Sequence, residues 1–464
     1  MIIQPVILTG GSGKRLWPLS TSDVPKPFIS FDGQYSLFQN TLQRLDKLNT
    51  SIGQLNNPII VCNQNHQSLV NDQAEKVKSA IASIILEPEI KNTAPALTLA
   101  AILIKKQFGD GIMISIHSDQ WISDEKEFSQ EISNAIKIAF EENVVLVGVE
   151  PTHPNPQYGY LKINQIKSSK NEYQVKEFVE KPSVHNAKKM IRSKNYLWNS
   201  GNFILKSSLW LRLMEKFAPE VLKQCESSLK NSNLESKTIN LDPSHFLKIK
   251  PISIDHAVLE KMQKENEYKS KLSAIKLSSQ WTDLGEWSSI WKFFKTENDN
   301  YFKGNISHSN VRNSLIVSQN QIITANNITD VFVVENNGEI LIQSNQTSQK
   351  FDKPWGYYEI LSRTSGQQIK KLTIFSGEAT SLQSHQFRSE HWIITQGVAK
   401  VTVEKETFNL NQNDSIFIPQ GSKHRIENSK HENLCLLEIQ TGVYLEEDDI
   451  TRFEDKYART NSST

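Results

Sequence analysis

The stretch LTGGSGKRLWPLSTSDVPKPF, residues 8–28, follows the first apolar run of the chain and places three glycines directly ahead of two basic side chains. Glycines let backbone N–H groups approach a phosphate closely, and a following helix adds its dipole. The spacing excludes both common phosphate loops. Leu16 stands where a dinucleotide fingerprint needs glycine, and Leu8 and Arg15 stand where a P-loop needs glycine and a hydroxyl residue. Taken alone, the glycines also fit an ordinary strand-to-loop turn.

The chain around this loop alternates short β-branched runs with longer helical stretches. Between residues 5 and 150 the strand-like runs are PVILT, PIIVC, SIILE, GIMISI and NVVLVGV, and the helical stretches include SLFQNTLQRL, HQSLVNDQAEKVKSA and EFSQEISNAIKIAF. This alternation predicts βαβ units and a largely parallel, doubly wound α/β sheet of the Rossmann type. Ligands of such sheets bind at the carboxyl ends of the strands.

Beyond residue 295 the pattern changes from α/β to β. Short alternating runs predict a small β-rich connector over 296–350 that ends in the polar linker SNQTSQK (344–350), and no internal repeat of the solenoid type is visible. Evenly spaced strand-like runs over 351–464, joined by Gly, Asn and Pro turns, predict a compact β-barrel. We therefore expect three parts, with 1–295 as the first.

Charge and cysteine content limit the partners and the compartment. Lys and Arg number 52 and Asp and Glu 51, so the net charge gives no general attraction to nucleic acid or to an anionic membrane. Three distant cysteines indicate neither a disulfide framework nor a cysteine zinc cluster. The opening apolar run is too short for a signal peptide or a membrane span. We expect a cytoplasmic protein that binds small charged metabolites, with no nucleic acid and no membrane as partner.

The whole stretch 8–28 is more specific than its glycines. It resembles the N-terminal sequence of the sugar-1-phosphate nucleotidyltransferases. Within that family, the string LWPLS is similar to the sequence of the mannose-1-phosphate guanylyltransferases. Further segments follow in the order of that family, up to about residue 295: EPEIKNTAPALTLAA, SIHSDQWI, QYGYL, FVEKP, LWNSGNFIL, SIDHAVLEK and WTDLGEWSSIW. The resemblance implies an enzyme that transfers GMP from GTP to α-D-mannose 1-phosphate, giving GDP-mannose and pyrophosphate.

The resemblance also implies roles for individual side chains. It assigns the nucleotide and its phosphates to Gly10, Gly11, Gly13, Arg15 and Lys26, the base to Asn92, Thr93 and Ala94, magnesium to Asp119 and Asp283, the sugar phosphate to Lys181, and the sugar to Gly159, Glu180 and Asn199. Carboxylate oxygens suit Mg²⁺, and cationic side chains suit phosphates. Taken singly, Asp119 could instead cap a helix, Glu180 could pair with a surface charge, and Asn199 could lie in a turn.

The implied reaction needs no strong base from the protein. The sugar phosphate oxygen that attacks the α-phosphorus is already anionic, so the side chains mainly align two polyanions and neutralise charge. Two other functions stay open: a nucleotidyltransferase for another base or hexose 1-phosphate, and a non-catalytic sensor of sugar nucleotides. The carboxylate pair argues against the sensor, which has no need of a metal site.

From Lys353 onward, KPWGYYEIL, SLQSHQFRSEHW, IPQGSKHRIEN and GVYLEEDDITRFEDKYAR are similar to the cupin domain of the mannose-1-phosphate guanylyltransferase/mannose-6-phosphate isomerases. The resemblance implies that His385, Glu390 and His424 hold a divalent transition metal such as Zn²⁺ or Co²⁺, with Arg388 as a catalytic cation. The implied reaction interconverts mannose 6-phosphate and fructose 6-phosphate. Asn413 replaces a glycine of that family, and asparagine accepts left-handed backbone.

Phe387 is the departure from that pattern, because it stands where a second histidine would bind the metal and it offers no lone pair. Three protein ligands with an open position still make a catalytic metal site. Gln383 or His391 could supply a further donor, although His391 follows Glu390 directly and should face the other side of a strand. The alternative is a barrel without metal that only packs or forms a homodimer.

Overall fold

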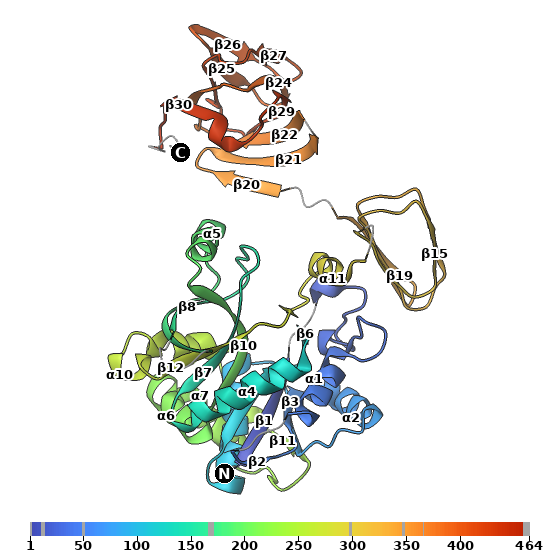
Figure 1. Cartoon of the computed structure of the whole chain (residues 1–464), viewed down its shortest axis with the longest axis vertical. Helices are drawn as coiled ribbons and strands as arrows, with labels where there is room; N and C mark the ends of the chain where they lie inside the picture. The colour runs from blue at the N-terminus through green and yellow to red at the C-terminus, as the bar shows by residue number, and fades with distance from the viewer. Residues whose placement is uncertain are drawn as a thin grey trace. The chain divides into compact units, whose positions relative to one another are not determined.

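The structure is a computed structural model that describes residues 2–10, 14–48, 52–165, 171–296, 299–345, 349–364 and 366–457. The chain folds into two compact units, Met1–Asn345 and Gln346–Thr464, the second of which is coloured orange to red in Figure 1. No helix among the described residues is both long and apolar enough to cross a membrane.

An 11-stranded mixed sheet forms the centre of the first unit, in the order β11-β4-β3-β1-β5-β10-β7-β12-β9-β8, with β2 beside β1. The strands are β1 (Ile2–Thr9), β2 (Gln54–Leu55), β3 (Ile59–Asn63), β4 (Ser83–Glu87), β5 (Ile112–His117), β7 (Val144–Val149), β8 (Tyr160–Gln165), β9 (Glu172–Val179), β10 (Tyr196–Lys206), β11 (Thr238–Asn240) and β12 (Leu272–Leu277). β1 pairs in parallel with β3 and β5, whereas β10 runs antiparallel between β5 and β7. The predicted α/β fold is confirmed, with antiparallel strands added after the βαβ units.

Helices cover both faces of this sheet. Val6 and Leu8 of β1 are buried in one core with α3, α6 and α7, and Ile3 and Ile7 are buried in a second core with α1, α2 and α4, as the alternation of side chains along a strand requires. The helices are α1 (Leu37–Asp46), α2 (Gln67–Lys76), α3 (Thr93–Phe108), α4 (Glu125–Phe140), α5 (Val184–Arg192), α6 (Ser207–Phe217), α7 (Pro219–Leu229), α8 (Pro243–Phe246), α9 (Glu260–Met262), α10 (Asn266–Lys269) and α11 (Trp287–Phe294). Because helices cover both faces of the sheet, a ligand can reach it only at an edge. In sheets of this type the carboxyl edge is the one that binds ligands.

The N-termini of two helices show how the local sequence determines where each helix begins. α1 begins with a capping box, in which Ser36 Oγ accepts from the Gln39 amide at 3.1 Å and Gln39 Oε1 accepts from the Ser36 amide at 3.0 Å. α3 begins at Asn92, whose side chain accepts from the Thr93 amide at 2.8 Å and whose φ is 73°. With a ψ of −173°, Asn92 lies in a region of backbone conformation that residues other than glycine rarely adopt, so the sharp turn from β4 into α3 is strained.

Residues 301–344 form a short β-solenoid. β14 (Tyr301–Lys303), β16 (Leu315–Ser318) and β18 (Val331–Asn336) stack in parallel, β15 (Ile306–Ser309) and β17 (Ile323–Asn326) form a second parallel pair, and β19 (Glu339–Ser344) is antiparallel to β18. Side-chain hydrogen bonds join Ser309 to Asn326 and Asn310 to Asn327, each 17 residues apart. The expectation of no solenoid repeat was therefore wrong. With two coils the 17-residue repeat occurs only once, which makes it hard to find in the sequence.

The solenoid shares a hydrophobic core with the rest of the first unit. Leu315 and Phe332 belong to the same buried cluster as Leu16 and Leu19. Asn336 Nδ2 also donates to the carbonyl of Pro18 at 2.9 Å. Leu16 and Leu19 therefore pack against the solenoid, whereas Phe28 of the same stretch lies in a core of the large sheet.

The second unit is a β-barrel of two sheets, in the orders β20-β21-β22-β29-β24-β27 and β26-β25-β28-β23-β30. Its strands are β20 (Gln349–Lys353), β21 (Gly356–Thr364), β22 (Gln367–Ile374), β23 (Leu382–His385), β24 (Arg388–Gln396), β25 (Ala399–Val403), β26 (Glu406–Leu410), β27 (Ser415–Ile418), β28 (His424–Glu427), β29 (Leu434–Gly442) and β30 (Ile450–Glu454), with the one-turn helix η6 (Glu447–Asp449) before β30. Trp355, Trp392 and Leu436 lie in its core. The predicted barrel is confirmed, and Asn413 has the expected left-handed φ, 74°.

Candidate functional site

Three charged residues meet at the carboxyl edge of the large sheet. Lys26, in the 3₁₀ turn η2 (Lys26–Phe28), places Nζ 2.8 Å from Asp119 Oδ2 and also donates to the backbone carbonyl of Asp283. Asp119 follows β5 by two residues, and Asp283 follows the short strand β13 (Trp281–Thr282). The structure thus brings together one predicted phosphate ligand and both predicted magnesium ligands.

Neighbouring charges set the ionisation of this cluster. Burial opposes ionisation of Asp119, but Lys26 and then His117 hold its pKa below the usual range of aspartate. Burial lowers the pKa of His117, and this effect outweighs the opposing charge of Asp119. At neutral pH the cluster therefore holds an anionic Asp119 beside a neutral His117.

The loop around Asp283 is held in an uncommon backbone conformation. Asp283 Oδ1 accepts hydrogen bonds from Tyr158 Oη at 2.7 Å and from the Gly285 amide at 3.2 Å. The next residue, Leu284, is buried and has a φ of 45°, a left-handed conformation that costs an apolar L-residue on the order of 1–2 kcal/mol. Surrounding contacts must stabilise this loop, and they keep Asp283 beside Lys26.

A cavity of about 390 Å³ lies at the ends of β1 and β4 and the start of α3, with His117 in its wall. Leu8, Val61 and Pro251 give it apolar walls, and Glu87 and Asn92 are among its polar groups. A largely apolar cavity with a few polar groups is typical of small-ligand sites. His117 in its wall interacts electrostatically with Asp119, so the phosphates of a nucleobase in this cavity would extend toward Lys26.

Glu87, the last residue of β4, is the unusual member of this cavity. Its side chain is buried, and its Oε1 has no hydrogen-bond partner among the residues that the structure describes. Burial raises the pKa of Glu87 to about 8. Buried carboxyl oxygens without a partner are rare in folded proteins, so this oxygen is available to a ligand with N–H donors.

The other predicted nucleotide residues differ in their placement. Gly10, Asn92 and Thr93 line the cavity, whereas Ala94 is fully buried below it and its amide donates to the carbonyl of Ile252 at 3.2 Å. The structure therefore does not place Ala94 at the cavity surface, because α3 turns that residue into the core. Arg15 is exposed. Gly11 and Gly13 lie outside the described residues.

Three residues assigned to the sugar lie together at the β8–β10 side of the sheet. The Asn199 amide donates to the carbonyl of Gly159 at 2.8 Å, and a Cβ on Gly159 would meet Glu180 Oε2 at 2.8 Å. Asp255 joins them, since its Oδ1 accepts from Asn199 Nδ2 at 3.2 Å. Burial, followed by the charge of Glu180, raises the pKa of Asp255 to about 6. Two carboxyl groups and an amide offer the donors and acceptors that hexose hydroxyls require.

Lys181 follows directly on Glu180. Its Nζ lies 3.3 Å from Glu180 Oε1, and its side chain is largely exposed. Its backbone is left-handed, with a φ of 46°. The arrangement places one exposed ammonium beside the sugar residues, where a sugar phosphate would need a cation.

In the barrel, His385, Glu390 and His424 offer ligand atoms that lie within 4.8 Å of one another. Glu390 Oε1 is 3.1 Å from His385 Nε2, and Glu390 Oε2 is 3.6 Å from His424 Nε2. Burial alone would raise the pKa of Glu390, but His385, His424 and Arg388 hold it well below its usual range. Burial lowers the pKa of His424. A charged carboxylate and a neutral imidazole are the forms that bind metals.

The donor set of this cluster fits a divalent metal. The Ser422 carbonyl lies 2.9 Å from His424 Nδ1 and accepts its proton, which leaves the Nε2 lone pair of His424 toward Glu390. Within the described part of the chain, His424 Nε2 and His385 Nδ1 lack a hydrogen-bond partner. Two imidazoles and a carboxylate are the ligands of one type of catalytic zinc site.

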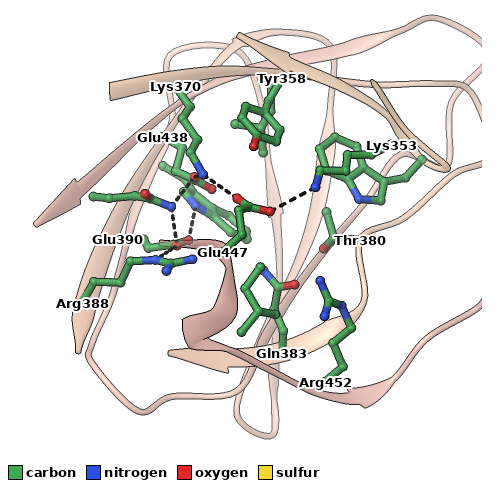
Figure 2. Close-up of a pocket in the computed structure, with 15 residues that line it drawn as sticks. Lys353, Tyr358, Lys370, Thr380, Gln383, Arg388, Glu390, Glu438, Glu447 and Arg452 are labelled. Atoms are coloured by element: carbon green, nitrogen blue, oxygen red, sulfur yellow. Dashed lines mark hydrogen bonds and ion pairs between the residues drawn. The ribbon is translucent and has the colours of Figure 1, made fainter. Parts of the chain in front are cut away.

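The residues around the cluster clarify the substitution at 387. Arg388 Nε donates to Glu390 Oε1 at 3.2 Å, and Arg388, Glu390 and Gln383 line one cavity, as Figure 2 shows. Phe387 is 44% exposed and lies edge-on to Tyr444, outside that lining. His391 is exposed, so the expectation that it faces away from Glu390 is confirmed. Of the two further donors considered from the sequence, only Gln383 lies in the cavity wall.

Sequence reasoning missed three polar residues at these sites. Glu87, Tyr158 and Asp255 each lie inside a segment that matched the family, EPEIK, QYGYL or SIDHAV, but none was singled out. A carboxylate placed directly at the end of the buried strand SIILE was the available signal for Glu87. Tyr158 and Asp255 gave no comparable local signal.

Comparisons with known proteins agree with both units. The family model described as Nucleotidyl transferase matches residues 4–300, and the one described as Mannose-6-phosphate isomerase C-terminal matches residues 341–455. A mannose-1-phosphate guanylyltransferase of Salmonella montevideo is 34% identical, and the match covers 99% of this chain and 100% of that protein. The alginate biosynthesis protein AlgA of Pseudomonas syringae pv. tomato is 34% identical, with 99% and 97% covered. A crystal structure described as a mannose-1-phosphate geranyltransferase from Thermus thermophilus has a TM-score of 0.63 at 24% identity and covers 74% of this chain and 95% of that one.

The first unit therefore has the fold of an α/β nucleotidyltransferase, and the second is an all-β barrel. This agreement confirms the resemblance found in the sequence. The chain belongs to the nucleotidyl transferase family and carries, at its C-terminal end, a mannose-6-phosphate isomerase C-terminal region.

Proposed function

We propose that the first unit transfers GMP from GTP to α-D-mannose 1-phosphate, giving GDP-mannose and pyrophosphate. The observation that carries this proposal is the cluster of Lys26, Asp119 and Asp283, which His117 connects to a base-sized cavity lined by Glu87. The relatives named mannose-1-phosphate guanylyltransferase support the choice of base and sugar.

Glu87 supports guanine as the base. Guanine presents two neighbouring donors, N1–H and the 2-amino group, and a carboxylate can accept both. Adenine has no such pair of donors. Adenine would leave the buried carboxylate of Glu87 without a hydrogen-bond donor. A site discriminates strongly against such a base, because the carboxylate is then both desolvated and unpaired.

The remaining residues align the two polyanions for in-line attack. Lys26 binds the triphosphate, Lys181 binds the phosphate of the sugar, and Glu180, Asn199 and Asp255 orient the hexose. Asp119 and Asp283 would hold Mg²⁺, which supplies charge neutralisation at the reacting phosphate. The attacking phosphate oxygen is already anionic, so no side chain has to remove a proton, and pyrophosphate leaves as the α-phosphorus bond to the new oxygen forms.

The direct test is pyrophosphate release by the purified chain with GTP, mannose 1-phosphate and Mg²⁺, with ATP, CTP, UTP and other hexose 1-phosphates as competing substrates. We expect GTP with mannose 1-phosphate to give the highest kcat/KM. A higher value for another pair would assign a different nucleotidyltransferase activity. Tight GDP-mannose binding with no turnover of any pair would instead identify a sensor.

Guanine binding by Glu87 has a consequence for proton balance. The free carboxyl has a pKa of about 8 and is mostly protonated at pH 7, whereas donation from guanine favours the ionised form and lowers that pKa. GDP-mannose should therefore bind more tightly as pH rises from about 6 to 8, with release of up to about one proton at pH 7. Isothermal titration calorimetry in two buffers of different ionisation enthalpy measures this release, and Glu87→Gln should abolish it. Equal release in wild type and variant would refute the role of Glu87.

For the barrel we propose mannose-6-phosphate isomerase activity at a metal site with three protein ligands. His385, Glu390 and His424 would hold the metal, and Glu390 would use Oε2, since Arg388 already donates to Oε1. A divalent metal such as Zn²⁺ or Co²⁺ would polarise the carbonyl oxygen during proton transfer between C1 and C2. The positive Arg388 beside it is placed to stabilise negative charge on the sugar.

His424→Ala tests this metal site directly. We expect its Zn²⁺ affinity to fall roughly 100-fold or more, because even outer partners of metal ligands contribute 10- to 100-fold. Metal content after dialysis at defined free Zn²⁺ gives the readout, and fructose 6-phosphate formation from mannose 6-phosphate gives a second one. His391→Ala is the matched control, since His391 is exposed on the opposite face of β24. Equal metal content in both variants would exclude the cluster as a metal site.

The Phe387→His variant tests whether the barrel lacks one metal ligand or has lost its metal site altogether. Because Phe387 is 44% exposed and packs on Tyr444, whereas His385 and His424 are buried, we expect the variant to bind one metal with little change in affinity. A cytoplasmic location and a homodimer remain predictions from the sequence.

A further inference from the structure

Two lysines in the barrel cavity share one carboxylate. Glu447 Oε2 lies 3.1 Å from Lys353 Nζ, and Glu447 Oε1 lies 3.0 Å from Lys370 Nζ, as the dashed lines in Figure 2 show. Lys353 comes from β20, Lys370 from β22 and Glu447 from η6. Both ammonium groups also lie over the ring of Tyr358, at 5.4 and 4.5 Å from its centroid. Three separate elements therefore bring two ammonium groups to one carboxylate.

The three side chains differ in how firmly they are held. The side chain of Lys370 is only 5% exposed, whereas that of Glu447 is 41% exposed. The segment around Glu447 is fixed by its neighbours: Asp449 accepts from the Gln386 amide at 2.9 Å, and the Glu446 carbonyl accepts from Arg388 at 2.9 Å. The Glu447 carboxylate, which also accepts a hydrogen bond from Tyr358, can thus exchange these partners for solvent without release of the segment, while Lys370 stays in the cavity.

Glu447 also limits the room in the cavity, which has a free volume of only about 40 Å³. A water molecule needs roughly 10–15 Å³ on this measure, so the space holds a few waters and no sugar phosphate. The carboxylate occupies the place between the lysines that a ligand would need.

The charges of the cavity favour an anionic ligand. Its lining holds four cationic side chains, Lys353, Lys370, Arg388 and Arg452, and three carboxyl groups, Glu390, Glu438 and Glu447. Glu438 lies close to Lys370, but its Oε1 is 3.9 Å from Lys370 Nζ and accepts a hydrogen bond from Gln440 at 2.7 Å. With Glu447 turned away, the two lysines would be left without a full counter-charge.

We propose that Lys353 and Lys370 form a binding subsite for a phosphomonoester dianion, and that Glu447 occupies this subsite as an internal competitor until the ligand displaces it. Two phosphoryl oxygens replace the two carboxylate oxygens, and the second negative charge satisfies both ammonium groups. The inference rests on the proposed isomerase function for the identity of the ligand as a hexose phosphate. Binding of the anion itself does not depend on turnover.

The test measures binding of inorganic phosphate and of mannose 6-phosphate to the full chain by isothermal titration calorimetry. Saturating GDP-mannose occupies the first unit, so that only the barrel responds. The variants are Lys353→Gln, Lys370→Gln and Glu447→Gln. Glu446→Gln is the matched control, because Glu446 loses the same charge in the same segment but pairs with the exposed Arg363.

We expect Glu447→Gln to bind both probes about tenfold more tightly, and each lysine variant to bind at least about tenfold more weakly. Lys353 is partly exposed, so its variant tests the subsite without removal of a buried charge. Wild-type affinity in both lysine variants would overturn the subsite, and an equal effect of Glu446→Gln and Glu447→Gln would overturn the internal competition.

The two probes also separate the sources of the phosphate. Tighter binding of mannose 6-phosphate than of phosphate supports a sugar phosphate site, whereas equal affinities would assign the site to free phosphate. Intact binding with no isomerase turnover would refute the proposed isomerase function and leave the subsite standing.

Discussion

Replacement of Asp283 by asparagine is expected to lower kcat for guanylyl transfer by roughly 1,000-fold while the protein stays folded. The substitution keeps the shape of the side chain and its hydrogen bond with Tyr158 but removes one of the two carboxylate charges at the reacting phosphate. Loss of an interaction that stabilises developing charge acts on kcat more than on KM. Pyrophosphate release at saturating substrates measures the effect, and thermal unfolding checks the fold.

Asp299→Asn is the matched control for this experiment. Asp299 pairs with Lys295 at an exposed helix end and has a left-handed φ of 56°, which asparagine adopts readily. We expect wild-type kcat for this control. Wild-type turnover in Asp283→Asn would remove Asp283 from the metal site, and rescue by Mn²⁺ at high concentration would support its assignment as a ligand.

Glu87→Gln is expected to cost about 100-fold in kcat/KM for GTP and to leave the low value for ATP nearly unchanged. The carboxylate can accept two hydrogen bonds from guanine, and bonds to a charged group contribute about 1.5–3 kcal/mol each. Glutamine offers one acceptor and adds a donor that repels N1–H. The preference for GTP over ATP should therefore collapse, as competing-substrate assays would show.

Glu89→Gln serves as the control for base selectivity, because Glu89 lies two residues further on and pairs with Lys91 at 2.8 Å. It should keep the wild-type preference for GTP. A Glu87→Gln enzyme with unchanged GTP preference would place guanine recognition elsewhere, with Asn92 and Thr93 as the next residues to test.

Periodic features of the fold could be predicted from the sequence. The strand-like runs PVILT and SIILE lie in β1 and β4, and the evenly spaced runs after residue 351 form the barrel. The solenoid could not be predicted in this way, because its 17-residue repeat occurs only once, although Leu315 and Phe332 as well as Asn310 and Asn327 keep that spacing. Antiparallel β10 also escaped, since its insertion between β5 and β7 is a long-range pairing.

The candidate sites also combine features that the sequence predicts with features that only the structure shows. Lys26 lies 93 residues from Asp119 and 257 from Asp283, so only the ordered family motifs could relate them. The unpaired oxygen of Glu87 depends on packing by several distant elements, which no local pattern describes. For Phe387, the sequence identified a missing ligand, whereas the outward position of its side chain required the structure.

The position of Lys26 bears on the order in which ligands arrive. Its ammonium already lies between the Asp119 carboxylate and the Asp283 carbonyl, so the resting site carries its own counter-ion. A divalent ion that came alone would have to expel this lysine into water with no new anion for it. A nucleoside triphosphate would supply that anion, so Lys26 could turn from Asp119 to one of its phosphates, and Asp119 and Asp283 would then be free to hold the ion. A single side chain thereby favours joint entry of metal and nucleotide over sequential entry.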